Sequence, residues 1–154
     1  MEIRYAREAD IPRLGELLLQ VCRVHREGRP DLFREGGRKY TDEELKELLR
    51  AGDVSILVAE ADGLVAGYAF CFLEKHKKGA FQEISTLYLD DLCVDENRRG
   101  CGVGEALYKA VLNMAKAAGC YNVTLNVWAS NDSARRFYEK MGLQVQKLGM
   151  EKIL

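Results

Sequence analysis

Apolar residues recur along this 154-residue chain with two periods, one typical of strands and one typical of helices. Residues 1–5 predict a short first strand. From Ile11 to His25 the apolar side chains fall at helical spacing, which predicts an amphipathic helix with one face on a core. Asp10 and Pro12 stand where helices often carry a capping side chain and an early proline, so we expect this helix to begin near residue 10.

A charged, glycine-rich stretch and a second helix follow. Residues 26–40 carry three glycines and a proline among many charges, which predicts an exposed loop. Loops of this length in compact domains are usually functional or disordered. Thr41 and Glu44 have the spacing of a capping box, so a helix should begin there and end near Gly52.

The rest of the chain predicts strands alternating with helices. Residues 54–61 and 64–73 are apolar and β-branched around an Asp62-Gly63 turn, which predicts an antiparallel hairpin. A long strand should begin near Phe81 and run through Glu83 to the acidic pair at 90 and 91. The remaining predicted elements are a helix after Gly104, a strand over 122–127, a helix capped near Asn131, and closing strands over 143–145 and 150–154. This order implies a mixed α/β sheet in three layers, with helices on both faces.

Between the long strand and the helix after it lies Arg99-Gly100-Cys101-Gly102-Val103-Gly104. At such a turn the free backbone N–H groups of the first helical turn and the helix dipole converge on one point, which suits a phosphate or pyrophosphate. A P-loop would close with Gly-Lys-Ser/Thr, but Glu105 follows Gly104. A dinucleotide fingerprint would place a small residue where Glu105 or Leu107 stands. A glycine-rich helix start without a ligand remains an alternative.

Composition narrows the possible classes of protein. With 47% hydrophobic and 31% charged residues, the chain fits one domain over residues 1–154. The formal net charge of −1 gives no basic field for nucleic acid or an anionic membrane. Five cysteines without a CxxC pair, and two histidines without ligand spacing, predict reduced thiols and no metal site. We therefore expect a cytoplasmic protein that binds neither nucleic acid nor membrane.

A second motif lies over residues 131–143, after the helix and the strand that follow the glycine-rich turn. Asn131, Arg135 and Tyr138 share one face of the last helix, and a Phe-Tyr pair precedes Glu-Lys-Met-Gly-Leu. Together with Arg99–Gly104, this segment resembles the two signatures of the GNAT superfamily of acyl-CoA-dependent N-acetyltransferases. Leu143 stands where that family commonly has Phe. The resemblance covers essentially the whole chain and implies the GNAT fold and acetyl-CoA as co-substrate.

The resemblance also implies roles for particular residues. Tyr138 would protonate the sulfur of CoA, while Asp90, Asp91 and Glu83 are candidates for binding or deprotonating the amine. Residues 88–94 are similar to the corresponding strand of polyamine acetyltransferases, in which Asp90 would be base-like and Asp91 would orient the amine; a β-bulge is expected around 90–92. Expected cofactor-binding residues are Leu92, Cys93, Val94, Arg99, Gly100, Cys101, Gly102, Val103, Gly104, Asn131, Ala134 and Arg135.

The sequence thus predicts an N-acetyltransferase that moves an acetyl group from acetyl-CoA to a primary amine by direct attack in a ternary complex. The two carboxylates favour a small cationic amine such as a diamine or polyamine. The basic residues of 26–40 would favour an acidic or phosphorylated amine if they turn inward. A protein or peptide amine and a non-catalytic acyl-CoA-binding domain remain alternatives. Relatives often pair through C-terminal strands, and the apolar 150–154 segment predicts a homodimer.

Overall fold

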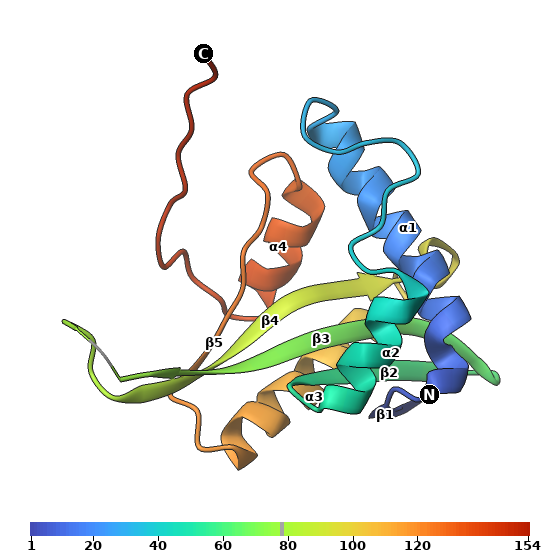
Figure 1. Cartoon of the computed structure of the whole chain (residues 1–154), viewed down its shortest axis with the longest axis horizontal. Coiled ribbons are helices and arrows are strands. Elements are labelled where there is room, and N and C mark those ends of the chain that lie inside the picture. The colour runs from blue at the N-terminus through green and yellow to red at the C-terminus, as the bar shows by residue number, and fades with distance from the viewer. Residues whose placement is uncertain (78) are drawn as a thin grey trace.

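The computed structural model describes residues 1–77 and 79–154 (Figure 1). Its strands and helices, in chain order, are β1 (Glu2–Tyr5), α1 (Ile11–Gly28), α2 (Asp42–Ala51), β2 (Val54–Ala61), β3 (Leu64–His76), β4 (Ile84–Val94), α3 (Val103–Ala117), β5 (Asn122–Thr124) and α4 (Asp132–Lys140), with short 3₁₀ turns at Glu8–Asp10 and Glu96–Arg98. The five strands lie in the order β1-β2-β3-β4-β5. Neighbours are antiparallel except β4 and β5, which are parallel. The mixed α/β sheet predicted from the sequence is confirmed.

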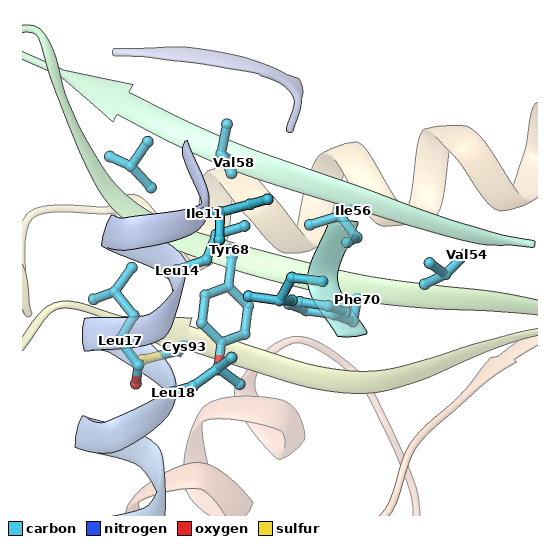
Figure 2. Close-up of a cluster of buried hydrophobic side chains, with 12 residues drawn as sticks. Ile11, Leu14, Leu17, Leu18, Val54, Ile56, Val58, Tyr68, Phe70 and Cys93 are labelled. Atoms are coloured by element: carbon cyan, nitrogen blue, oxygen red, sulfur yellow. The ribbon is translucent and has the colours of Figure 1, made fainter. Parts of the chain in front are cut away.

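Helices cover both faces of the sheet. On one face, α1 and α2 bury Leu14, Leu18 and Leu45 against Tyr68 and Phe70 of β3. Figure 2 shows the α1 side chains reaching the two aromatic rings of β3. On the other face, α3 packs on the sheet, and Phe137 and Tyr138 of α4 join the same cluster. The strands therefore form the middle of three layers, each held by burial of one apolar face.

Local sequence signals account for most of the boundaries. The Thr41 hydroxyl accepts from the Glu44 amide at 3.2 Å, and the Glu44 carboxylate accepts from the Thr41 amide at 2.7 Å, so the predicted capping box is confirmed. The Asp62-Gly63 turn has both residues at positive φ, 54° and 75°, as a two-residue hairpin requires. Asp10 precedes α1 as expected but does not cap it: its carboxylate accepts from the Arg7 amide and from Arg4.

β4 and β5 pair only briefly. Their register joins Thr86, Leu87 and Tyr88 to residues 122–124, after which the two strands separate (Figure 1). The strand predicted over 122–127 is therefore too long, because residues beyond Thr124 lose their ladder partner. Beyond Tyr88, β4 keeps β3 as its neighbour on one side only.

β4 also contains a β-bulge at the expected place. Phe70 pairs with Asp91 and Cys71 with Leu89, so Asp90 is the extra residue between them. A bulge bends the strand and changes the direction of its side chains. Simple alternation along the strand therefore fails across Asp90, and both carboxylates meet groups on the side of α1 and α2, described below.

Two sequence predictions about the C-terminal segment are wrong. Residues 143–145 and 150–154 form no strand: Leu143 still packs against the core, and the chain after it extends away from the domain (Figure 1). The apolar side chains of this arm are largely exposed: Val145, Leu148, Met150, Ile153 and Leu154. An ion pair between Arg29 and Glu151 joins the arm to the end of α1. β-propensity alone does not make a strand, because a strand also needs a neighbour for its backbone groups.

No helix within 1–77 and 79–154 is both long and apolar enough to cross a membrane. All five cysteines are free thiols.

Candidate active site

The turn between β4 and α3 presents unused backbone N–H groups. Gly100 and Gly102 have φ of 77° and 78°, and a Cβ built on either would meet open space. The first amide that turns back into the helix is that of Ala106, which donates to the Gly102 carbonyl at 3.0 Å. No amide from Gly100 to Glu105 finds an acceptor within the part of the chain that the structure describes. Positive-φ glycines before a helix start make a concave nest of N–H groups that suits an anion.

The surroundings of this nest are held firmly. Asp95, at the end of β4, accepts from the Asn97 amide at 3.0 Å and from Arg13 of α1, which fixes the path of the chain into the turn. Gly104 lies so close to the ring of Phe137 that a Cβ there would stand 3.4 Å from it. Arg99 is exposed beside the nest and has no carboxylate partner among the described residues. Its guanidinium is therefore available to a phosphate group.

The unpaired edge of β4 leads to this nest. Between Leu89 and Val94 the strand has β3 on one side and, among the described residues, no strand on the other, since β5 has separated. An extended ligand can hydrogen-bond to such an edge as an added strand does. Leu92, Cys93 and Val94 supply this backbone. The Cys93 thiol itself is buried, contacts the Leu17 carbonyl at 3.6 Å and has its pKa raised to about 12 by burial, so it is no nucleophile at neutral pH.

Asp90 lies in the bulge and is held by the segment before α2. Lys39 donates to Asp90 Oδ2 from its Nζ at 2.6 Å, and the Tyr40 hydroxyl donates to the same oxygen at 3.3 Å. Tyr40 in turn stacks on Phe70, with ring centroids 5.5 Å apart. The loop over 29–40 thus reaches the end of β4 through these two side chains.

Asp91 has a different environment. Its Oδ2 accepts from the Tyr68 hydroxyl at 2.8 Å, because Tyr68 lies on the same face of the neighbouring strand. Burial raises the pKa of Asp91 to about 6, and the nearby charge of Asp90 adds to this, while the Tyr68 hydrogen bond and Lys39 oppose it. Asp91 is therefore a stronger base than an ordinary aspartate and is still ionised at neutral pH.

Tyr138 projects from α4 toward the same end of β4. Its ring packs against Tyr108 and Phe137, with centroids 6.2 Å and 5.1 Å away. Burial raises its pKa above the usual value, and the negative charge of Asp91 raises it further. The hydroxyl stays protonated at neutral pH and donates to no other described residue. This side chain can therefore give a proton to a ligand group.

Glu83 does not join this group. It precedes β4 and pairs with Lys77 at 3.3 Å, beside an open groove of about 470 Å³ lined also by Lys75 and Tyr121. At about 3.3 Å per residue along the strand, it stands roughly 20 Å from Asp90. The prediction that the strand runs from Phe81 through Glu83 is wrong, and the structure does not bring Glu83 to the acidic pair.

The residues expected from the second motif lie at the start of α4. Asn131 caps the helix, its side-chain oxygen accepting from the Ala134 amide at 3.1 Å. Arg135 lies one turn further along and is paired loosely with Asp132 and Glu139, at 3.5 Å and 3.8 Å. Asn131 thus has a structural role in this chain, and its amide nitrogen, which donates to no other described residue, remains available to a ligand.

Sequence reasoning missed three side chains that hold the acidic pair: Lys39, Tyr40 and Tyr68. Tyr68 could have been found, because a tyrosine at a strand position that faces a core needs a partner for its hydroxyl. Nothing in the sequence links Lys39 or Tyr40 to Asp90, which lies fifty residues further along the chain. Their contact depends on the path of the loop.

A sheet between two layers of helices, whose last two strands separate, and an anion nest at the end of the open edge together define the class of protein. The family model described as acetyltransferase (GNAT) family matches residues 18–143, and the chain belongs to this family. A mutant of the BH1408 protein from Bacillus halodurans has 30% sequence identity and a TM-score of 0.95, over 100% of this chain and 99% of its own.

Two curated relatives match part of this chain. An uncharacterized N-acetyltransferase, MJ1530 of Methanocaldococcus jannaschii, is 36% identical over 92 residues, which are 59% of this chain and 53% of the relative. The peptidyl-lysine N-acetyltransferase YjaB of Escherichia coli is 36% identical over 72 residues, which are 47% of this chain and 46% of the relative. The chain thus spans about half the length of these curated relatives.

Proposed function

We propose that this chain transfers an acetyl group from acetyl-CoA to a primary amine of a small cationic molecule, a diamine or polyamine being the best fit. The observation that carries the proposal is the continuity of the site: the open edge of β4 runs from the acidic pair directly to the amide nest at 100–105. A pantetheine arm fits an open strand edge, and a pyrophosphate fits the nest. Membership of the GNAT family supports acetyl-CoA as the donor.

Asp90 and Asp91 have different roles in binding and deprotonating the amine. A protonated amine is attracted by Asp90 and Asp91 and must lose a proton before it attacks. The family resemblance gives the base-like position to Asp90, but the environment favours Asp91: Asp90 is already held by Lys39 and Tyr40, whereas burial raises the pKa of Asp91 to about 6. We assign deprotonation, directly or through water, to Asp91 and orientation of the amine to Asp90.

Other groups of the site act on the CoA thiolate that leaves and on the negative charge that develops on the acetyl oxygen. Backbone N–H groups at the open edge near Leu92 and Val94 are placed to stabilise the oxyanion that forms on the acetyl carbonyl. Tyr138 supplies the proton for the departing thiolate, since its phenol stays protonated and has no other described acceptor. Direct transfer from donor to amine fits a site whose neighbouring thiols, those of Cys71 and Cys93, are both buried.

A lysine side chain of a protein or peptide is the second candidate acceptor. YjaB, by its name, acetylates peptidyl lysine, and a lysine presents the same ammonium on an aliphatic chain as a diamine does. A non-catalytic acyl-CoA-binding domain is a weaker alternative, because it would not need a tyrosine and a base of raised pKa beside the open edge. A cytoplasmic location fits the five free thiols, one of them exposed.

The acceptor proposal is tested by kinetics with a panel of amines. We expect kcat/KM to be larger for diamines and polyamines than for amino-sugar phosphates or acidic amines. Asp90→Asn should weaken selection of cationic amines mainly through KM, and Asp91→Asn should lower kcat by about 10- to 1,000-fold. A preference for acidic amines, or full activity of both variants, would contradict this assignment. A preference for lysine peptides would favour the second candidate.

We also propose that the protein is a homodimer joined through its C-terminal arm, residues 143–154. This arm exposes five apolar side chains, and β5 has an outer edge without a strand among the described residues. A partner's arm laid against β5 would cover both. Light scattering should give a dimer for the wild type and a monomer for a Leu148→Lys/Ile153→Lys double variant. Leu64→Lys, an equally polar change at an exposed hairpin residue, is the control and should stay dimeric. A monomeric wild type at high micromolar concentration would end this proposal.

A further inference from the structure

The chain places one of its own primary amines at the acidic pair. Lys39 Nζ lies 2.6 Å from Asp90 Oδ2 and 5.8 Å from the centre of the Tyr40 ring. Its positive charge also lowers the pKa of Asp91 and of His25, so it lies among the groups around the site. Lys39 is the one cation paired with either carboxylate in the described part of the chain.

The chemistry of Lys39 matches that expected of the acceptor. Its ε-amine is primary, stands at the end of a flexible aliphatic chain, and meets the same carboxylate that would bind a diamine. The Lys39 side chain is 44% exposed, whereas the Asp90 side chain is only 13% exposed. The lysine can therefore leave and return without disturbing the core, while the carboxylate stays in place.

We propose that Lys39 is an internal acceptor that the protein acetylates in cis when no better amine is bound; this inference rests on the proposed function. The acidic pair takes a proton from the Lys39 ammonium, and the neutral nitrogen forms a bond to the acetyl carbon of acetyl-CoA. The nitrogen loses its second proton to solvent as the carbon–sulfur bond breaks, and the CoA thiolate takes a proton from Tyr138, which is restored by the proton held on the acidic pair. The products are Nε-acetyl-Lys39, free CoA and one proton released to solvent.

Acetylation would change the acceptor site. The acetylated nitrogen carries no charge, so the ion pair with Asp90 is lost and the carboxylate becomes available to an incoming cation. An ion pair with one solvent-exposed partner is worth a few-fold in affinity, so KM for a cationic amine should fall by about 2- to 5-fold. Without acetylation, Lys39 competes with the substrate amine for Asp90.

The test is mass spectrometry of the full-length protein incubated with acetyl-CoA alone. We expect one acetyl group per chain, mapped to Lys39, at a first-order rate that does not change on dilution of the protein. Lys39→Arg keeps the ion pair and should lose this acetyl group. Lys46→Arg, at an exposed residue of α2 away from Asp90, should keep it. Tyr138→Phe should slow it at least as much as it slows turnover.

The outcomes separate this inference from the proposed function. If external amines are acetylated and Lys39 is not, the inference is wrong while the function stands. Acetylation of Lys39 no faster than of Lys46, or at the same rate in protein unfolded by urea, would show plain chemical modification and also overturn it. A rate that rises with protein concentration would exclude reaction in cis. If neither Lys39 nor any external amine is acetylated although CoA binds, the proposed function itself fails.

Discussion

The two halves of β4 have nearly opposite environments. The first half, Ile84–Tyr88, lies between β3 and β5, and its polar Thr86 is buried with its hydroxyl donating to Asn122 Oδ1 at 2.7 Å. The second half, Leu89–Val94, has β3 as its one strand neighbour in the part of the chain that the structure describes, contains the bulge, and carries two carboxylates. The first half has strand partners on both sides, whereas the backbone groups on the outer side of the second half have no strand partner among the described residues and remain available to a ligand. The separation of β5 after Thr124 thus converts a structural strand into a site.

Gly102→Glu should give the largest effect on the open half. The new carboxylate would stand in the amide nest, where it repels a pyrophosphate, so binding of CoA should be abolished. Gly52→Glu is a matched control, because Gly52 also has positive φ, 72°, and open space around it, but ends α2. Each variant should lose roughly 1 kcal/mol of unfolding free energy. Calorimetry that finds equal CoA affinity in the two variants would remove the nest from the site.

Tyr138→Phe should lower turnover by about 10- to 1,000-fold with little change in CoA affinity, because the ring stays and only the proton donor is lost. Tyr108→Phe makes the same change on the ring that packs against Tyr138, at a residue buried in the core. It should leave turnover almost unaltered. Steady-state and single-turnover kinetics on both variants check this; equal rates would mean that water protonates the thiolate.

The raised pKa of Asp91 should make the unfolding free energy depend on pH. Its pKa is raised to about 6 in the folded protein, so the folded state binds this proton more tightly than the unfolded state, whose pKa is near 4. The resulting stabilisation is complete below pH 4 and is lost as the pH rises through 6. Asp91→Asn removes this dependence and should gain up to about 3 kcal/mol in unfolding free energy relative to wild type between pH 4 and 8.

Urea unfolding of both proteins at several pH values measures this difference, and a constant offset would contradict it. In the same way, kcat/KM of the wild type should rise with pH through about 6 as Asp91 ionises. Asp90→Asn is the control in both measurements. Because it keeps Asp91, its unfolding free energy and its kcat/KM should still change as the pH passes through about 6.

The smallest effect is expected in the closed half. Thr86→Val leaves the shape and removes the hydroxyl, so the unfolding free energy should fall by about 1 kcal/mol. Turnover and CoA affinity should be unchanged, because Thr86 lies before the strands separate. Denaturant titration and kinetics check this. A large loss of turnover would mean that the two halves of β4 do not act independently.

Much of this protein could be predicted from its sequence, because the signals are local. The capping box at Thr41, the Asp62-Gly63 turn and the glycine-rich turn at 99–104 depend on residues within a few positions of one another. Hydrophobic period predicted the helices and most of the strands, and the family resemblance predicted the bulge at Asp90.

What only the tertiary structure decided depends on distant partners. β5 is shorter than its β-branched sequence predicts, and the C-terminal arm forms no strand, because a strand needs a neighbour that the sequence does not specify. Glu83 lies away from the acidic pair because β4 is long and extended, while Lys39 reaches Asp90 through the path of a loop. The raised pKa of Asp91 likewise comes from burial by segments far apart in the chain, and burial is a property of the folded whole.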